Sequence, residues 1–246
     1  LDISRNLDHL SSIVVMTSDK CYDNSLETRT HVETDAMGGF DPYSASKGAT
    51  ELITNAYRNS FFNSEKNKIG LATVRAGNVI GGGDWAKYRL IPDCMKSISS
   101  NIDIKLRNPN STRPWQHVLE PISGMLWLAN RLVENPKKFN GSWNLGPSLD
   151  EKLLTVHEIV QILIEKCNSN VSIETENNLK LHESKLLSID PSKANNELHL
   201  KNILSIHQSI TETISWYDAF YKNNEMMNFT IDQIENFVKT AKNKNL

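Results

Sequence analysis

The chain has 246 residues, of which 39% are hydrophobic and 23% charged, and a formal net charge of -2. A chain of this length can bury a substantial core, and its nearly balanced charge gives no electrostatic basis for binding nucleic acid or an anionic membrane. No run approaches the roughly 18 apolar residues of a membrane span, and no signal sequence is recognisable at the N-terminus, so we expect a cytoplasmic protein. The three cysteines, Cys21, Cys94 and Cys167, lack C-x-x-C spacing, which favours reduced, buried thiols over disulfides or a metal site.

The first part of the chain alternates strand and helix. Leu1 to Leu10 has apolar residues at helical spacing without a preceding cap, so we expect the tail of a helix in a chain that begins inside a domain. A β-branched run at 12–19 predicts a buried parallel strand, and residues 69–75 predict a second one. Between them a helix is expected from about Pro42 to Phe62, with four apolar side chains facing inward: Leu52, Ile53, Ala56 and Phe61. This order predicts an α/β fold with a Rossmann-like parallel sheet.

The pattern becomes mixed after residue 80. It predicts helices near 92–100 and 122–135, a helix after the capping box Thr155–Glu158, a helix with Ile210, Ile214, Tyr217 and Tyr221 inward, and a last helix capped by Thr230 and Gln233. Strands are expected at 102–106 and 171–176, and the end from residue 239 is expected to fray. We expect residues 1–80 to form the later part of the Rossmann-like domain. Residues 81–246 are expected to form mainly a smaller mixed α/β lobe, with about 108–150 returning to the first domain.

Two short stretches carry candidate chemistry. Tyr43 and Lys47 lie four residues apart at a helix start, so both project from one face, and the lysine charge can lower the tyrosine pKa from about 10 and make it a general base. Taken alone, the motif favours an exposed helical pair without catalytic function. Thr17-Ser18-Asp19-Lys20 ends the first strand, where open α/β sheets bind ligands. A polar turn that merely closes a strand is the alternative interpretation.

Gly81-Gly82-Gly83-Asp84-Trp85-Ala86 matches the letters of the dinucleotide fingerprint G-x-G-x-x-A. The fingerprint requires its glycines to open a helix directly, whereas the next expected helix begins near Pro92. We therefore interpret these glycines as a mobile loop that lets the backbone approach a ligand. The usual glycine-rich first turn of a dinucleotide-binding domain is absent from the sequence.

A hydroxyl at a strand end followed by Y-x-x-x-K is the layout of the short-chain dehydrogenase/reductase superfamily. Further segments narrow the resemblance: 17–24, 37–48, 57–62, 75–85, 89–92 and Arg113-Pro114-Trp115-Gln116-His117-Val118. Together they resemble the nucleotide-sugar 4,6-dehydratases of the extended branch, the NAD-dependent epimerase/dehydratase family, and among them the CDP-glucose 4,6-dehydratases. Members of that family carry further N-terminal residues with the glycine-rich loop, so the resemblance implies a partial member.

The resemblance implies a lyase reaction on CDP-glucose that gives CDP-4-keto-6-deoxyglucose: oxidation at C4, loss of water across C5 and C6, and reduction at C6, with NAD as cofactor. It implies Tyr43 as base at the sugar 4-hydroxyl, Lys47 as its partner, Ser18 at the 4-oxygen, Asp19 as acid and Lys20 as the base at C5. Contacts to NAD are expected from Thr17, Tyr43, Lys47 and Gly77. Contacts to the nucleotide sugar are expected from Asn78, Arg89, Leu90, Ile91, Arg113, Asn144 and His182, and no metal is implied. The resemblance further implies a homo-oligomer paired through the helix with Tyr43, and a place in deoxysugar synthesis for surface polysaccharide such as O-antigen.

Several alternatives stay open. An epimerase or decarboxylase of another nucleotide sugar would not need Asp19 and Lys20, and a non-catalytic nucleotide-sugar-binding fragment would explain the missing fingerprint. Lys20 must be neutral to act as a base, which requires a pKa well below about 10.4. His117 is equally a structural histidine or a ligand contact. The indoles of Trp85, Trp115 and Trp143 can stack on a base, with core packing favoured for Trp143.

Overall fold

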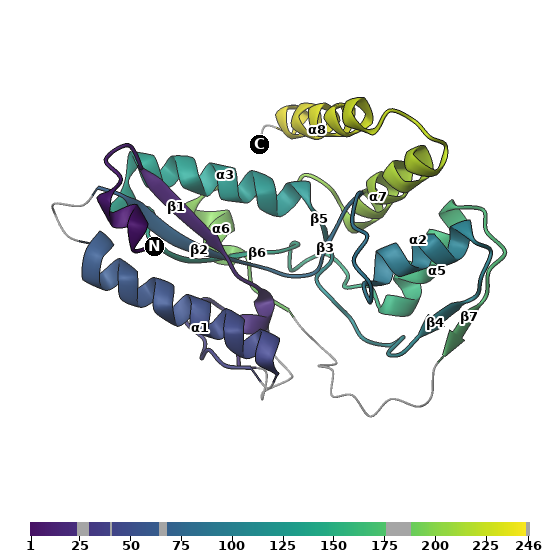
Figure 1. The fold of residues 1–246 in the computed structure, drawn as a ribbon, viewed down its shortest axis with the longest axis horizontal. Helices are drawn as coiled ribbons and strands as arrows, with labels where there is room; N and C mark the ends of the chain where they lie inside the picture. The colour runs from purple at the N-terminus through teal and green to yellow at the C-terminus, as the bar shows by residue number, and fades with distance from the viewer. Residues whose placement is uncertain (24–29, 40, 64–67, 176–187, 245–246) are drawn as a thin grey trace. The chain divides into compact units, whose positions relative to one another are not determined.

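The computed structural model describes residues 1–23, 30–39, 41–63, 68–175 and 188–244 (Figure 1). The chain divides into two compact units, of which unit 1 comprises 1–77, 121–149 and 187–201, and unit 2 comprises 78–120, 150–186 and 202–246. Within the described ranges, no helix has the length and apolar character needed to cross a membrane.

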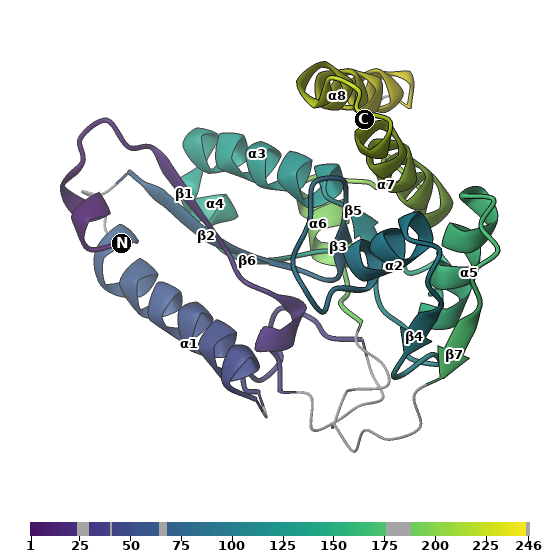
Figure 2. The same ribbon diagram turned by 45° about the vertical axis from the view of Figure 1, so that its right-hand side comes forward.

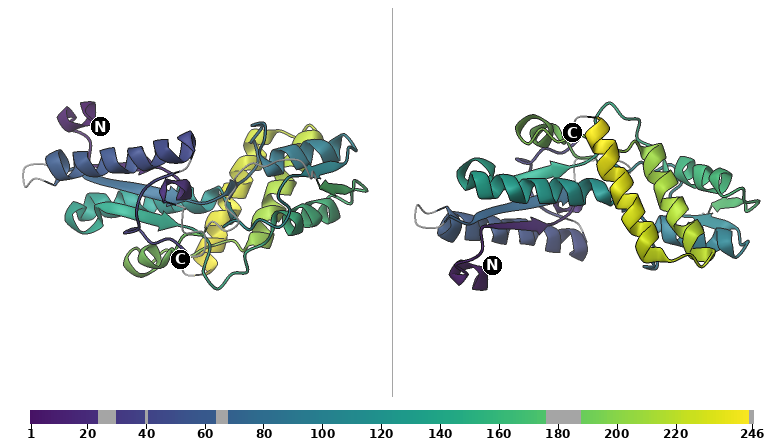
Figure 3. Two further views of the ribbon diagram at one scale, coloured as in Figure 1. Left: turned by 90° about the horizontal axis from the view of Figure 1, so that it is seen from below. Right: turned by 90° about the horizontal axis from the view of Figure 1, so that it is seen from above.

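Unit 1 is built on a three-stranded parallel sheet with the order β1-β2-β6. Figures 1 and 3 show helix α1 on one face of this sheet and helix α3 on the other. Its strands are β1 (Ser12–Met16), β2 (Gly70–Ala76) and β6 (Gly141–Leu145), and its helices are α1 (Pro42–Tyr57), most of α3 (Leu119–Glu134), α4 (Pro136–Phe139) and α6 (Ser192–Glu197). Three short turns complete it: η1 (Ile3–Asn6), η2 (Asp19–Cys21) and the π-type turn η3 (Arg58–Phe62). The predicted α/β fold with a parallel sheet is confirmed.

Strand β2 is the centre of unit 1 and is buried along its whole length. Because side chains alternate along a strand, Ala72 and Val74 pack with Leu128 and Leu132 of α3, whereas the residues between them face α1. Strand β1 pairs only with β2 among the described strands and is partly exposed, so the prediction of a fully buried strand is wrong there. The prediction of an N-terminal helix tail is also wrong, because residues 3–6 form a 3-10 turn that ends at an extended Leu7.

Helix α1 buries a polar face. Leu52 and Ile53, which the apolar spacing placed inward, are 62% and 56% exposed, and Ala56 and Phe61 are exposed as well. The side chains of Glu51 and Thr54 face the sheet instead. Hydrophobic spacing predicts the buried face only when the core opposite is apolar, and here the opposing side chains of β2 include Thr73 and Arg75, which bond to Glu51.

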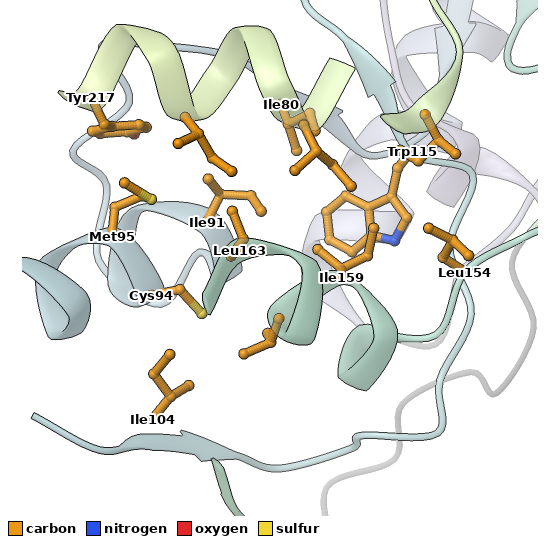
Figure 4. Close-up of a cluster of buried hydrophobic side chains, with 14 of the residues drawn as sticks. Ile80, Ile91, Cys94, Met95, Ile104, Trp115, Leu154, Ile159, Leu163 and Tyr217 are labelled. Atoms are coloured by element: carbon orange, nitrogen blue, oxygen red, sulfur yellow. The ribbon is translucent and has the colours of Figure 1, made fainter. Parts of the chain in front are cut away.

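Unit 2 has two small parallel sheets, β3–β5 and β4–β7, covered by helices. Its strands are β3 (Val79–Ile80), β4 (Ile104–Leu106), β5 (Gln116–His117) and β7 (Ile173–Thr175), and its helices are α2 (Leu90–Ser99), α5 (Val156–Lys166), α7 (Ile206–Tyr221) and α8 (Met226–Asn243). Figure 4 shows the core that α2, α5 and α7 share, in which apolar side chains of the three helices pack together with Trp115. The predicted capping box of α5 is present, with Thr155 and Glu158 each bonding the other's backbone N–H. All three cysteines are free and buried or partly buried, as predicted.

Gly82 packs against Trp216 so closely that a Cβ there would lie 1.9 Å from the indole, so this glycine admits a side chain of α7, and the expected approach of the loop to a ligand stays a prediction. Three other expectations for unit 2 are wrong. Helix α8 begins at Met226 with Glu225 as its cap, whereas the Thr230 hydroxyl accepts a hydrogen bond from the Trp216 indole, and the helix continues to Asn243 without fraying. Tyr221, placed inward by spacing, is 39% exposed.

Candidate active site

The strand end after β1 folds into a tight polar turn. The Ser18 hydroxyl donates to Asp19 Oδ1 at 2.9 Å and accepts the Lys20 backbone N–H at 3.2 Å, so it caps turn η2. Thr17, Ser18 and Asp19 are buried, while the side chain of Lys20 is exposed. The turn therefore presents one ammonium to solvent above a buried hydroxyl and carboxyl group.

The start of helix α1 holds Tyr43 and Lys47. Asp41 caps the helix by accepting from Tyr43 N, Ser44 N and the Ser44 hydroxyl at 2.9, 3.1 and 2.6 Å. These bonds, the Ser44 hydroxyl first, lower the pKa of Asp41, and the charge of Lys20 adds to the effect. Tyr43 is 52% exposed, and Lys47 Nζ lies 5.7 Å from the centre of its ring. Within the described residues, neither the Tyr43 hydroxyl nor the Lys47 ammonium has a hydrogen-bond partner, so both are free to meet a ligand.

Gly48 lets these two parts of the site approach each other. A Cβ at this position would lie 3.2 Å from the Gly38 carbonyl oxygen and 3.3 Å from that of Cys21, the last residue of η2. Gly38 N in turn donates to the Cys21 carbonyl at 3.0 Å. Figures 1 and 2 show the turn after β1 beside the first turns of α1. The structure thus brings Ser18, Asp19 and Lys20 next to the helix that bears Tyr43 and Lys47.

A buried polar network lies directly behind this site and was not predicted. Glu51 Oε1 accepts the Thr17 hydroxyl at 2.5 Å, and Oε2 accepts the Thr73 hydroxyl and Arg75 Nη2, each at 2.8 Å. Burial disfavours the Glu51 carboxylate, but the bonds from Arg75 and the hydroxyls outweigh it, so the pKa of Glu51 is lowered. Burial of Arg75 on its own would lower the pKa of its guanidinium. The hydrogen bond to Glu51 and the charge of Glu51 outweigh burial, so the pKa of Arg75 is raised. The signal available in the sequence was a single acidic residue four positions after Lys47 and an arginine within an apolar strand.

Asn144 belongs to the same network, which corrects its expected place in a substrate cleft. It is fully buried; its Oδ1 accepts the Tyr22 hydroxyl at 2.6 Å and its Nδ2 donates to the His31 carbonyl at 3.0 Å. Tyr22 also accepts a bond from Arg75 Nη1 at 2.8 Å and stacks on His31 at 4.7 Å. The amide of Asn144 is thus already bonded within the protein, and we do not keep it among the proposed substrate contacts.

The other expected substrate contacts lie in unit 2. Arg113 is buried with its Nη1 donating to the Thr112 carbonyl at 2.7 Å, whereas Arg89 is exposed and lies 3.6 Å from an Asp84 carboxylate oxygen. The side chain of Ile91 lies in the hydrophobic core of unit 2, so its expected contact with substrate is corrected (Figure 4). Leu90 packs partly against the same core. His182 lies outside the described residues.

Asn78 and Gly77 lie at the junction in sequence between the two units, and both are partly buried. The Asn78 carbonyl accepts the Gln116 N–H at 3.0 Å, which leaves its side-chain amide out of this backbone pairing. The Thr17 hydroxyl, expected at the cofactor, is engaged by Glu51. The structure therefore keeps Asn78 and Gly77 as candidate contacts and gives Thr17 a role inside the protein.

The three tryptophans considered as stacking partners for a base have different surroundings. Trp143 is fully buried in unit 1, as favoured. Trp115 is buried within the core of unit 2, where Figure 4 shows its ring among apolar side chains, so it is not placed to stack on a ligand. Trp85 is half exposed and packs against Phe220 at 4.8 Å in an aromatic cluster with α7. Of the three, only Trp85 keeps an exposed ring.

His117 follows Trp115 on β5 and is buried. Its Nδ1 accepts the Leu119 N–H at 3.4 Å, while Nε2 has no hydrogen-bond partner among the residues that the structure describes. Burial without an anionic partner lowers the pKa of His117 from 6.5 to about 4. The ring is therefore neutral in the folded protein at pH 7, with Nε2 as the nitrogen that carries the proton.

This buried ring makes the stability of the protein depend on pH. The unfolded chain binds a proton on His117 below pH 6.5, whereas the folded chain does so only below about 4. Folding stability must therefore fall as the pH drops through this window, by roughly 3 kcal/mol at about 1.4 kcal/mol per unit. We expect the free energy of unfolding of His117→Gln, measured by urea denaturation, to fall less between pH 7 and pH 4 than that of the parent protein, by this same amount. The matched variant His207→Gln changes an exposed ring and should run parallel to the parent; a parallel curve for His117→Gln would contradict the prediction.

Comparisons with known proteins show the family of the chain. A family model described as GDP-mannose 4,6 dehydratase matches residues 1–213. The CDP-glucose 4,6-dehydratase of Salmonella typhimurium is 41% identical over 244 residues, which cover 98% of this chain and 68% of that protein. The dTDP-glucose 4,6-dehydratase of an Actinoplanes species is 24% identical, over 86% of this chain and 61% of that protein.

Solved structures share the fold at lower sequence identity. A UDP-glucose 4-epimerase from Thermotoga maritima superposes with a TM-score of 0.73 at 14% identity, over 87% of this chain and 65% of that one. A dTDP-glucose 4,6-dehydratase from Streptomyces venezuelae, solved with NAD and TYD bound, gives 0.72 at 20% identity, over 87% and 62%. This chain thus spans about two thirds of the length of these relatives. By its family match and its close relative, the chain belongs to the GDP-mannose 4,6-dehydratase family of extended short-chain dehydrogenases/reductases.

Proposed function

We propose that the protein is an NAD-dependent CDP-glucose 4,6-dehydratase, a lyase that converts CDP-glucose to CDP-4-keto-6-deoxyglucose. The observation that carries the proposal is the acid-and-amine turn, Asp19 and Lys20, docked beside the tyrosine and lysine of α1. A dehydratase needs both pairs, because water loss requires a base at C5 and an acid at the 6-hydroxyl in addition to the base at the 4-hydroxyl. The choice of CDP-glucose is supported by the 41% identity to the Salmonella typhimurium enzyme of that name.

The first proton transfer is assigned to Tyr43. The side chain of Tyr43 is half exposed at the start of α1 with Lys47 on the same face, and it is assigned to take the proton from the sugar 4-hydroxyl. The Ser18 hydroxyl is assigned to the 4-oxygen. To reach it, Ser18 must turn its proton away from Asp19 Oδ1, to which it now donates.

Water loss is assigned to the η2 turn. Lys20 is assigned the removal of the C5 proton, which the 4-ketone makes acidic, and Asp19 is assigned the donation of a proton to the departing 6-hydroxyl. The exposed side chain of Lys20 can swing toward a sugar ring, whereas Asp19 is buried and fixed next to it. The difference in burial supports Lys20 as a base that can move to the sugar and Asp19 as an acid that stays in place.

The chain offers residues that fit the nicotinamide end of NAD. The carboxyl ends of parallel strands β1 and β2 are where α/β sheets bind dinucleotides, and the free ammonium of Lys47 suits the hydroxyls of the nicotinamide ribose. When bound, NAD supplies the oxidant at C4 and returns the reducing equivalent at C6. Lys47 would hold its ribose, and Tyr43 and Gly77 would complete the contacts; no residue of this sequence is assigned to its pyrophosphate.

Recognition of the nucleotide is assigned to unit 2. Arg113 and Arg89 carry guanidinium groups suited to two oxygens of a diphosphate, and Asn78 offers an amide. His182 stays a predicted contact. We further propose that the enzyme is cytoplasmic. We also propose that two copies pair through α1, because Leu52 and Ile53 leave apolar side chains exposed on the outer face of this helix. The product of the enzyme would enter deoxysugar synthesis for surface polysaccharide such as O-antigen.

The proposal is tested by incubating the polypeptide, as its gene encodes it, with NAD and each of CDP-, dTDP-, UDP- and GDP-linked hexoses. CDP-glucose should give a product lighter by one water, with the carbonyl spectrum of a 4-keto-6-deoxy sugar. Dehydration of another nucleotide sugar with CDP-glucose unchanged would contradict the nucleotide assignment. Epimerised product of unchanged mass would instead favour the epimerase.

A further inference from the structure

Glu51 links every strand of the sheet in unit 1 to helix α1. Its carboxylate accepts bonds from Thr17 after β1 and from Thr73 and Arg75 of β2, and lies 3.3 Å from the Ser142 hydroxyl of β6. It is 3% exposed and lies on α1 two turns after Tyr43, so its own carboxylate is shielded from solvent. None of the catalytic roles above requires it.

Two of these bonds lead to the catalytic turn. Thr17 immediately precedes Ser18, and its hydroxyl is bonded directly to Glu51 at 2.5 Å. Tyr22 immediately follows the turn, and its hydroxyl is bonded at 2.8 Å to Arg75, whose other terminal nitrogen is bonded to Glu51. The segment between them, Ser18 to Cys21, is therefore anchored to α1 at both of its ends through one carboxylate.

We propose that Glu51 is a positioning residue that fixes Ser18, Asp19 and Lys20 relative to Tyr43 and Lys47. This inference rests on the proposed dehydratase function. The first half of the reaction uses mainly the two side chains of α1, and the second uses the two of η2 on the same sugar. A carboxylate that ties the turn to the helix sets the separation of the two pairs, and a misplacement of about 1 Å can cost about 100-fold in rate.

The structure provides a matched set of variants. Glu51→Asp keeps the charge for Arg75 but is one methylene too short to reach every partner. Thr17→Val keeps the shape and removes the direct anchor of the turn, together with the 3.2 Å bond from the same hydroxyl to the Val74 carbonyl. Thr73→Val removes a bond of 2.8 Å to the same carboxylate but leaves both anchors of the turn in place, so it serves as the control.

The experiment measures, for the parent and each variant, the free energy of unfolding, kcat and KM for CDP-glucose, and the exchange of the C5 proton with deuterated solvent. We expect Glu51→Asp and Thr17→Val to lower kcat and C5 exchange by about 10- to 100-fold. Reduced nicotinamide should accumulate in both, because C4 oxidation outpaces water loss. KM should stay within about threefold of the parent value in both variants. Thr73→Val should lose stability, but its kcat and C5 exchange should not fall in this way and reduced nicotinamide should not accumulate.

The outcomes distinguish a failure of the role assigned to Glu51 from a failure of the proposed dehydratase function. The inference is overturned if kcat falls in all three variants only in proportion to the loss in free energy of unfolding. It is also overturned if the rate of C5 proton exchange does not fall together with kcat in any of them. Either result would make Glu51 merely structural. Should Glu51→Asp fail to fold, Thr17→Val against Thr73→Val decides the question. If the parent protein does not dehydrate CDP-glucose at all, the proposed function fails first, and the assignment of Glu51 falls with it.

Discussion

Tyr43→Phe is expected to lower kcat for CDP-glucose dehydration by about 10²- to 10⁴-fold, the contribution of a positioned general base. The variant loses only a hydroxyl that is exposed at the start of α1 and has no partner within the described residues. Its free energy of unfolding should therefore stay within about 0.5 kcal/mol of the parent value. Product formation and reduction of NAD should fall together, because the reaction stops before C4 is oxidised.

The same helix supplies a control for this change. Tyr57→Phe alters a tyrosine at the other end of α1, whose ring packs on Phe61 at 5.4 Å, and should leave kcat unchanged. Lys20→Ala gives the contrasting phenotype: C4 oxidation should continue, while exchange of the C5 proton with deuterated solvent stops. Exchange retained in Lys20→Ala would assign the C5 base to another residue, and a Tyr43→Phe variant as active as Tyr57→Phe would remove Tyr43 from the chemistry.

The sequence predicted the elements of this fold well where local rules dominate. Parallel strands, the start of α1 at Pro42 and the capping box of Thr155 follow from β-branched runs, from proline at a first turn and from side-chain capping. The structure also places the turn with Ser18, Asp19 and Lys20 beside the helix that bears Tyr43 and Lys47, and the roles of these residues stay predictions. Each motif lies next to an element end, where position along the chain largely determines position in space.

The errors at the inner face of α1 and at Asn144 share one physical cause, which is that polar partners came from distant parts of the chain. Leu52 and Ile53 were predicted inward because their spacing is apolar, yet Glu51 faces the sheet since Arg75, 24 residues later, neutralises it there. Asn144 was expected at a substrate, but it is bonded to Tyr22, 122 residues earlier in the chain. No local pattern contains both members of such a pair, so the network behind the site could only be found in three dimensions.

The Arg75–Glu51 pair also yields the largest expected effect on stability. Arg75→Met should lower the free energy of unfolding by about 3–5 kcal/mol, because it leaves the buried Glu51 carboxylate without its cation. The double variant Glu51→Gln/Arg75→Met replaces both charges, and its glutamine can still bond to the hydroxyls of Thr17 and Thr73. We therefore expect the double variant to be more stable than Arg75→Met, with a coupling energy of about 1–3 kcal/mol in urea denaturation.

The pH dependence of this cycle tests its electrostatic origin. In the parent, the folded pKa of Glu51 lies below its ordinary 4.5, so its contribution is present above that pH and is lost as the pH falls through the folded pKa. In Arg75→Met, burial without the guanidinium should raise the folded pKa, so that this variant loses stability as the pH rises. The stability gap between parent and Arg75→Met should thus widen from pH 4 to pH 8, while the gap between parent and Glu51→Gln/Arg75→Met should change only at the acidic end. A gap of constant size for Arg75→Met would show that lost packing, and not an uncompensated carboxylate, makes Arg75 necessary.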